Sequence, residues 1–468
     1  MVIFMSINTK KYEIDMCSGN LFAKLVKFCF PLMLMGILQL LYNAADLIVV
    51  SNFSDDPNAL GAVGSTGSLI NLTVNLFMGL SIGTNVLCAK LYGAKNYDRI
   101  GKVVHTSILI SFLIGLFLML FGIIFAKDLL HIMNNDLELS KVYLQIYFIG
   151  MPFNLVYNFA AAILRAVGDT KRPLYYLIFT GLINVILNLI FVIFFNMSVA
   201  GVALATIISQ FLSFLLIMRT LIKTKECYQF KFKELKIHKE ELLDLIRIGL
   251  PAGIQSSLFS ISNALIQSSV NLFGEIAMNG NSAAQSIEGF VYVAMNSVYH
   301  AAIAFTSQNY GAKNEKNIKK VTKYSLLYVC IVALSLGILI FSFGKPLINI
   351  YTKNPDEVSV AYLRLHFLCL PYFLCGIMDV MVGVLRGLGK STMPMVVSIV
   401  GVCGIRILWI LLIFYNLTDF VNTSDLAYLY VSYPISWIIT FLTHLICYFI
   451  VSKKVFKLFK INDNLLLN

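Results

Sequence analysis

Residues 107–126, SILISFLIGLFLMLFGIIFA, form twenty consecutive positions without a single charged side chain. Two further stretches, 176–195 and 325–344, have the same length and the same lack of charge. In a helix, about 20 apolar residues match the thickness of the hydrocarbon core of a bilayer. One such segment is compatible with the core of a soluble protein, but about a dozen in one chain indicate a membrane protein.

The composition of the whole chain agrees with this interpretation. Of the 468 residues, 58% are hydrophobic and only 13% are charged, and the mean hydropathy is +0.80. Soluble domains carry about 25% charged residues, so this chain has too few charges to cover a soluble surface. The nine cysteines show no CxxC pair and no zinc-type spacing, which favours small buried residues over a disulfide or metal framework.

We predict an all-α membrane protein with twelve transmembrane helices, whose orientation follows from the charges between them. Of the 36 Lys and Arg residues, 30 fall on the side of both termini, 4 fall on the other side, and Arg364 and Arg406 lie within spans. Basic loops face the cytoplasm, which explains the net charge of +12 without a nucleic-acid partner. The predicted spans are 25–50, 60–89, 103–126, 141–164, 173–196, 198–219, 246–272, 279–308, 322–344, 359–385, 393–415 and 426–451.

The two halves of the chain repeat the same landmarks at a nearly constant spacing. The sequence YGAKN at 92–96 recurs unchanged at 310–314, and its glycines are expected to adopt a positive φ after a long helix. The other repeated landmarks are Pro31 with Pro251, Pro152 with Pro371, and the segments 165–173 with 386–394.

Each half holds six spans, an even number, so both halves enter the membrane in the same orientation. We therefore predict two homologous six-helix bundles, 1–222 and 246–468, joined by a basic cytoplasmic linker at 223–245. Two bundles of this kind suit alternating access better than a fixed pore.

At these residues the sequence resembles the multidrug and toxic compound extrusion (MATE) family, in particular its prokaryotic DNA-damage-inducible-F-like branch. The resemblance covers roughly 20–450 and implies export of drugs or metabolites by antiport with H⁺ or Na⁺. The matching stretches include QLLYN at 39–43 with Asp46, ILRAVGDTK at 163–171, GVALAT at 201–206, IEGF at 287–290 and QNYGA at 308–312.

Asp46 is the foremost candidate for ion coupling. It lies fifteen residues beyond Pro31 among apolar neighbours. A charge within a span costs about 2.5–3.5 kcal/mol on insertion scales, so such a residue is a functional candidate. Asn43 and Gln39 precede Asp46 by three and seven residues, which predicts one shared helix face. The carboxylate could bind H⁺, or Na⁺ with the help of nearby carbonyl oxygens; a structural hydrogen bond between helices is the alternative.

Other spans supply polar side chains that could complete this site. The resemblance implies that Asp46, Asn184 and Thr206 belong to an ion site in the first bundle. The family often has a second carboxylate where this chain has Asn188, which leaves the coupling ion and its stoichiometry open. The carboxylates of a sodium site found in another branch are replaced by Phe259 and Cys375. The predicted ion-coupling residues are Asp46, Asn43, Asn158, Asn184, Asn188 and Thr206, and Gln39 and Gln210 are predicted to line the substrate cavity.

Two carboxylates of the second half are further candidates for the substrate cavity. Glu288 and Asp379 fall within predicted spans and could attract cationic compounds. The alternative for both is an interhelical pair with Arg364 or Arg406. The isolated histidines show no HExxH or similar spacing, which favours satisfied interhelical hydrogen bonds over metal ligands.

The leading hypothesis is a secondary active exporter of small organic, often cationic, compounds. No Walker loop is present, so ATP is not expected to drive it directly. A lipid-linked oligosaccharide flippase is the alternative, while a membrane enzyme would need a clustered catalytic site and a channel would need a filter. We expect no cofactor, no metal apart from a possible Na⁺ at Asp46, and a monomer among the lipids of the plasma (inner) membrane with both termini cytoplasmic.

Overall fold

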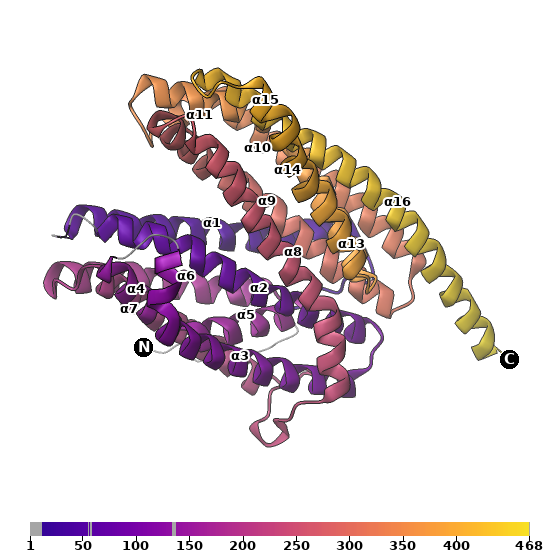
Figure 1. The fold of residues 1–468 in the computed structure, drawn as a ribbon. Helices are drawn as coiled ribbons and strands as arrows, with labels where there is room; N and C mark the ends of the chain where they lie inside the picture. Colours follow the sequence, from indigo (N-terminus) through magenta and orange to yellow (C-terminus); the bar gives the residue numbers. More distant parts are fainter. Residues whose placement is uncertain (1–11, 55, 57–58, 133–136, 468) are drawn as a thin grey trace. The chain divides into compact units, whose positions relative to one another are not determined.

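The structure is a computed structural model that describes residues 12–54, 56, 59–132 and 137–467 and contains only helices and loops in these ranges (Figure 1). The first half contains α1 (Leu21–Phe53), α2 (Ala59–Gly93), α3 (Tyr97–Ile132), α4 (Glu138–Ile149), α5 (Met151–Ala166), α6 (Lys171–Leu189), the π-helical η2 (Ile190–Phe194) and α7 (Ser198–Lys223). The second half contains α8 (Lys239–Asn271), α9 (Glu275–Gly311), α10 (Glu315–Ile348), α11 (Pro355–Leu368), α12 (Tyr372–Gly387), α13 (Thr392–Ser398), η4 (Ile399–Gly404), α14 (Ile405–Trp409), η5 (Ile410–Phe414), α15 (Tyr415–Leu417) and α16 (Leu426–Leu467), and the short 3₁₀ turns η3 (Phe232–Glu234) and η6 (Thr423–Asp425) precede α8 and α16.

These elements correspond to the twelve predicted spans. Within the described ranges, nine helices are long and apolar enough to cross a membrane, and the bent pairs α4–α5 and α11–α12 bring the number to eleven. The remaining unit is α9, which has 37 residues and is therefore long enough to span a bilayer. Polar residues such as Gln285 and Glu288 lower its hydropathy.

Both bent pairs occur at prolines that the repeat places in equivalent positions. The bend between α4 and α5 is 47°, with Pro152 in the first turn of α5. The bend between α11 and α12 is 52°, and Pro371 caps α12. Proline has no N–H to donate to the preceding turn, so each span breaks where its proline stands.

The structure divides into two compact units that exchange the first parts of two helices. One unit comprises Leu34–Gly253 and the residues up to Asp15, and the other comprises Met16–Met33 and the residues from Ile254 onward. Helix α1 therefore passes between units just after Pro31, and α8 does so just after Pro251. This division differs from the boundaries proposed from the sequence because the beginnings of α1 and α8 pack with the opposite half.

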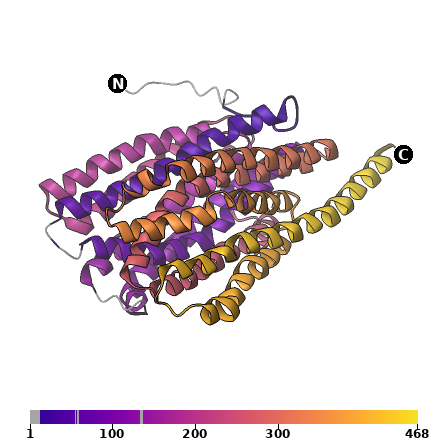
Figure 2. The ribbon, with the colours of Figure 1, turned by 90° about the horizontal axis from the view of Figure 1, so that it is seen from above.

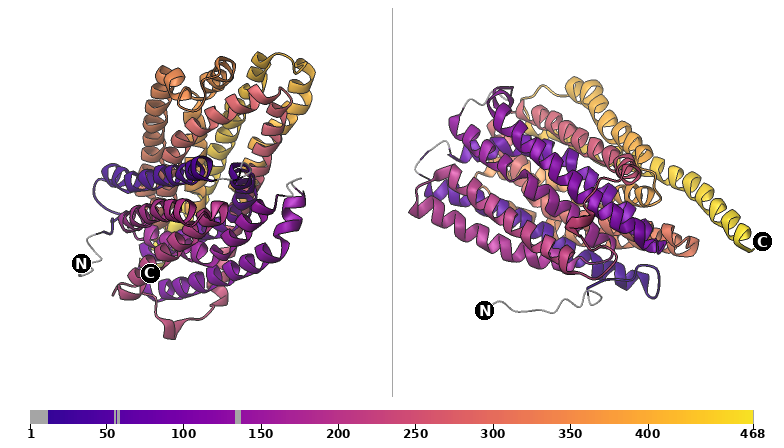
Figure 3. Two further views of the ribbon diagram at one scale, coloured as in Figure 1. Left: turned by 90° about the vertical axis from the view of Figure 1, so that its left-hand side faces the viewer. Right: turned by 90° about the horizontal axis from the view of Figure 1, so that it is seen from below.

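Within each unit, a few helices make most of the packing. In the first unit, α3 packs against α2, α4 and α5, and α7 packs against α4, α5 and α6 (Figure 3). In the second unit, α9 packs against α10, α11 and α12, and α12 packs against α16, which continues without a break for 42 residues (Figure 2).

Four glycines allow α2 and α8 to touch at their backbones inside the first unit. A Cβ atom at Gly79 would overlap the backbone of Gly253, and one at Gly253 would overlap the carbonyl group of Leu76. Gly83 and Gly249 face each other in the same way. Both helices thus carry a Gly-x-x-x-Gly pattern, which allows close helix approach in membranes, and this contact holds the beginning of α8 against the first half.

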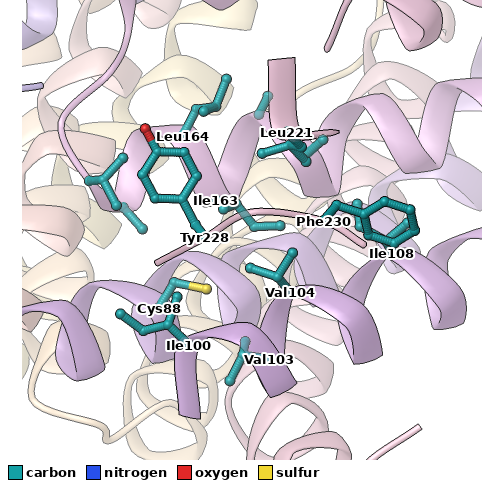
Figure 4. Close-up of a cluster of buried hydrophobic side chains, with 14 of the residues drawn as sticks. Cys88, Ile100, Val103, Val104, Ile108, Ile163, Leu164, Leu221, Tyr228 and Phe230 are labelled. Atoms are coloured by element: carbon teal, nitrogen blue, oxygen red, sulfur yellow. The ribbon is translucent and has the colours of Figure 1, made fainter. Parts of the chain in front are cut away.

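Two aromatic residues of the segment predicted as a linker, 223–245, pack into the first unit. Tyr228 and Phe230 are 0% and 2% exposed and lie among apolar side chains of α3, α5 and α7 (Figure 4). The Tyr228 hydroxyl donates to Glu13 Oε1 (2.9 Å), and the Tyr92 hydroxyl donates to Glu13 Oε2 (3.1 Å). Burial raises the pKa of Glu13 above its ordinary value, and the two tyrosine hydrogen bonds oppose this shift.

In the repeated YGAKN loops, the left-handed backbone conformation falls on the lysine, whereas the prediction of a positive φ at the glycine was wrong. Lys95 and Lys313, not the glycines before them, adopt the left-handed conformation, with φ of 57° and 53°. The glycines instead remain the last residues of α2 and α9. The similar values at both lysines are an independent structural sign of the repeat.

We predict that Gly253→Ala destabilises the protein by about 1–3 kcal/mol because the added methyl group overpacks the α2–α8 crossing. Gly101→Ala is the matched control, since no heavy atom lies within 4 Å of a Cβ built there, and both changes gain the same helix propensity. Equilibrium unfolding in detergent, followed by circular dichroism, measures both. Equal stability of the two variants would show that the close approach does not matter.

Candidate functional site

Asp46 lies in the part of α1 that belongs to the first unit, where it meets α6. Its Oδ1 atom accepts a hydrogen bond of 2.5 Å from Asn188 Nδ2. Asn188 is fully buried and Asp46 is partly buried. Asn188 and Asn184 are four residues apart on α6, so both amides face the same side of that helix.

Hydrogen bonds extend from this pair to α7. Asn188 Nδ2 also lies 3.4 Å from Asn184 Oδ1, and Asn184 Nδ2 lies 3.4 Å from Thr206 Oγ1. Thr206 in turn makes a side-chain hydrogen bond to Asp46. The four residues form one connected group, which we call the Asp46 cluster, built from α1, α6 and α7.

The Asp46 cluster offers oxygen atoms to a small cation. The carboxylate carries the negative charge, and no ion pair involves it among the described residues. Asn188 Oδ1 is buried and accepts no hydrogen bond from the described part of the chain. Carboxylate, amide and hydroxyl oxygens are ligands that suit Na⁺-like hard cations, and the carboxylate alone can hold a proton.

Helix α4 contributes a residue that the sequence analysis did not single out. Tyr147 lies close enough to Asp46 for an electrostatic interaction, and it is hydrogen bonded to the side chain of Gln210. Gln210 therefore lies near the cluster through Tyr147. A tyrosine within an apolar span is typical of ordinary packing, so the sequence carried no distinct signal for it.

Among the described residues, no hydrogen bond joins the other candidates of the first half to the Asp46 cluster. Asn43 and Gln39 are exposed on α1. Asn158 donates instead to the main-chain oxygen (2.8 Å) and Oδ1 (3.0 Å) of Asn154 on its own helix. Their roles in ion or substrate binding stay predictions.

Glu288 is held in an ion pair, the second of the two alternatives drawn from the sequence. Arg364 donates from Nε to Oε1 and from Nη2 to Oε2, both at 2.8 Å, and from Nη1 to Asn281 Oδ1 at 2.8 Å. Glu288 and Arg364 are 5% and 4% exposed. Because Arg364 neutralises its charge, the expectation that Glu288 attracts cationic substrates is not supported by this geometry.

Asp379 on α12 is partly buried beside Tyr292, Tyr299 and Cys375, and Arg386 is its principal charged neighbour. Arg386 bonds to Tyr299 and donates to Gln255 Oε1 at 2.8 Å. The described residues include no group of three or more His, Cys, Asp or Glu that could hold a metal. A substrate role for Asp379 therefore stays a prediction.

Comparison with known proteins identifies relatives of the whole chain. The family model MatE matches residues 31–190 and again 251–412, so one model describes both halves of the repeat. The probable multidrug resistance protein YoeA of Bacillus subtilis is 30% identical over 390 residues, 81% of this chain and 84% of the relative. The multidrug export protein MepA of Staphylococcus aureus is 22% identical, over 85% of this chain and 88% of the relative.

Solved structures share the fold. An outward-facing multidrug resistance MATE family transporter superposes with a TM-score of 0.85 at 21% identity, covering 94% of this chain and 97% of the other. A MOP superfamily transporter from Pyrococcus furiosus gives a TM-score of 0.86 at 21% identity, covering 93% and 97%.

We predict that Glu288→Gln lowers the stability of the protein by about 3–5 kcal/mol because Arg364 is left buried without its counter-charge. Glu275→Gln, an exposed position at the start of the same helix, is expected to change stability little. The double variant Glu288→Leu with Arg364→Met removes both charges and should recover most of the loss. Unfolding in detergent measures all three, and a tolerated Glu288→Gln would show that the pair is not structural.

Proposed function

The chain belongs to the MatE family of multidrug efflux transporters, and on this premise we propose that it exports small organic compounds by antiport with H⁺ or Na⁺. The Asp46 cluster is the observation that supports coupling most directly. It places one carboxylate, which has no basic partner among the described residues, among amide and hydroxyl groups inside a single unit. A site of this kind can bind a cation from one side of the membrane and release it to the other.

The cluster suits reversible occupancy. When the site is empty, Asn188 Nδ2 satisfies Asp46 Oδ1, which lowers the cost of a bare carboxylate in a medium of low dielectric constant. A proton would neutralise the carboxylate, whereas Na⁺ would take oxygens of Asp46, Asn188 and Thr206. Both ions therefore compete with the same short hydrogen bond.

The energetics of exchange are balanced for a single ion. Moving one elementary charge across 100 mV is worth about 2.3 kcal/mol, so one entering cation can drive the exit of one monovalent organic cation. The single carboxylate of the cluster, with Asn188 at its side, favours one ion in each cycle. Release of the ion at one membrane face and of the substrate at the other constitutes alternating access.

The proposal also covers the oligomeric state, the location and the substrates of the transporter. The transporter would lie as a monomer in the plasma (inner) membrane with both termini in the cytoplasm, and small organic cations would be among its substrates. The relatives are multidrug resistance and export proteins, which does not favour the oligosaccharide flippase alternative. No cofactor is required for antiport.

We predict that Asp46→Asn abolishes gradient-driven transport because the amide can neither take up a proton nor supply charge to Na⁺. In inverted vesicles, uptake of a fluorescent organic cation should fall to the level of vesicles without the protein. Asp98→Asn, at an exposed position on α3, is the control and should transport normally. Imposing the pH gradient and the Na⁺ gradient separately identifies the ion, and normal transport by Asp46→Asn would refute the assignment.

We also predict that Asn188→Asp restores part of the transport lost in Asp46→Asn. The double variant keeps one carboxylate and one amide at the two ends of the 2.5 Å hydrogen bond, so the charge moves by only one side chain. The same vesicle assay measures this exchange. A complete absence of recovery would mean that Asn188 does not share the ion.

A further inference from the structure

The second unit contains a counterpart of the Asp46 cluster, and its charge is opposite. Counting from the equivalent prolines, Asp46 lies fifteen residues after Pro31, and Ile266 lies fifteen residues after Pro251. Ile266 is 2% exposed. The carboxylate of the first unit is therefore replaced by an apolar side chain in the second.

The counterpart of Asn184 is Arg406. Asn184 lies eleven residues after Pro173, and Arg406 lies twelve residues after Pro394. The π-helical turn η4 lies between Pro394 and Arg406, and a π turn contains one residue more than an α turn. The extra residue brings Arg406 to the helix face that Asn184 occupies.

The hydrogen bonds support this correspondence. In the first unit Asn184 on α6 donates to Thr206 on α7. In the second unit Arg406 Nε donates to Ser436 Oγ on α16 at 3.0 Å. Each bond joins the fifth span of its half to the sixth.

Arg406 is buried without a counter-charge. It is 4% exposed, and its guanidinium carbon lies 4.0 Å from the ring centroid of Tyr433 and 5.7 Å from that of Trp437. Within the described ranges no carboxylate pairs with it, whereas Arg364 has Glu288. Within the same ranges the two Nη groups make no hydrogen bond, and only Nε does.

The aromatic rings compensate this charge only in part. An arginine stays protonated in proteins and has five N–H donors, of which Ser436 takes one. Stacking on an aromatic ring is worth about 0.5–2 kcal/mol, less than the several kcal/mol that a buried ion loses in hydration. A planar oxyanion that meets both Nη groups would supply the missing charge and acceptors.

We propose that Arg406 binds the carboxylate of an aromatic organic compound. The proposal deepens the exporter function by naming a substrate class for the second unit. Trp437 packs edge-on against Tyr372 with ring centroids 5.3 Å apart, and Tyr372 is only partly buried. The aromatic rings of Tyr433, Trp437 and Tyr372 therefore lie next to one another beside the guanidinium. A lipid phosphate is a poorer fit because Arg406 lies near the middle of the span Thr392–Leu417, far from the head groups.

The chain contains its own reporter for this site. It has two tryptophans, and Trp437 lies beside Arg406 whereas Trp409 donates from its ring nitrogen to the main-chain oxygen of Tyr428 (2.8 Å). In the Trp409→Phe background, all tryptophan fluorescence comes from Trp437. The probes are 4-nitrobenzoate and 4-nitrobenzamide, which both quench tryptophan and differ in charge.

We predict saturable quenching of Trp437 by 4-nitrobenzoate in purified protein, with a dissociation constant about tenfold or more below that of 4-nitrobenzamide, as expected for a charge-assisted pair. Arg406→Gln should remove the difference, and Arg406→Lys should keep part of it because the charge remains without the planar fork. Arg219→Gln, exposed on α7, is the matched control and should behave like the parent protein.

Equal binding of both probes to the parent protein, or an undiminished preference in Arg406→Gln, would overturn the proposal. Circular dichroism establishes that each variant is folded, and the comparison within the parent protein decides the matter even if Arg406→Gln fails to fold. The measurement uses no ion gradient, so Asp46→Asn should show the same preference. A loss of coupling in that variant and a loss of anion binding are thus separate results.

Discussion

The interior of a bilayer provides no water to a polar or charged side chain, and the arrangement of this protein follows from that constraint. Each buried charge must be neutralised by a charged partner, stabilised by hydrogen bonds or balanced by an ion that binds reversibly. Glu288 and Arg364 meet the requirement permanently, through two parallel hydrogen bonds and Asn281. Asp46 meets it through side-chain hydrogen bonds to Asn188 and Thr206, which a cation would displace in the proposed antiport. The ion pair of Glu288 is consistent with a structural role, whereas the proposed role in ion coupling belongs to Asp46.

Much of the architecture could be predicted because it follows from hydrophobicity and spacing. The long apolar runs locate the spans, the basic loops indicate an orientation, and the repeated prolines mark the broken helices. The family relationship drawn from Asp46 and its neighbouring motifs is confirmed by the model that matches both halves. Each of these features depends on residues that are close together in the sequence, so it can be predicted without knowing which helices contact each other.

Features that depend on which side chains meet across helices could not be predicted. For Glu288 the sequence left two alternatives open, the substrate cavity and a pair with Arg364 or Arg406, and it could not decide between them because Arg364 lies 76 positions away, on α11. The packing of Tyr228 and Phe230 could not be predicted because these aromatic residues stand among the charged residues of the linker. The close contact between α2 and α8 could not be predicted because its two Gly-x-x-x-Gly patterns lie in different halves of the chain. The left-handed conformation of Lys95 and Lys313 was not predicted either, because glycine, which stands two positions earlier, is the residue that usually adopts it.

The crossing of α1 and α8 between the units has a mechanical consequence. Each proline removes the amide that would bond the carbonyl four residues before it, at Lys27 and Arg247. These are also the places where the chain leaves one body and enters the other. Each of the two helices therefore lacks one backbone hydrogen bond close to the point where it passes between the units. We expect α1 and α8 to bend there more easily than the packed interiors of the units, which contain Asp46 and Arg406.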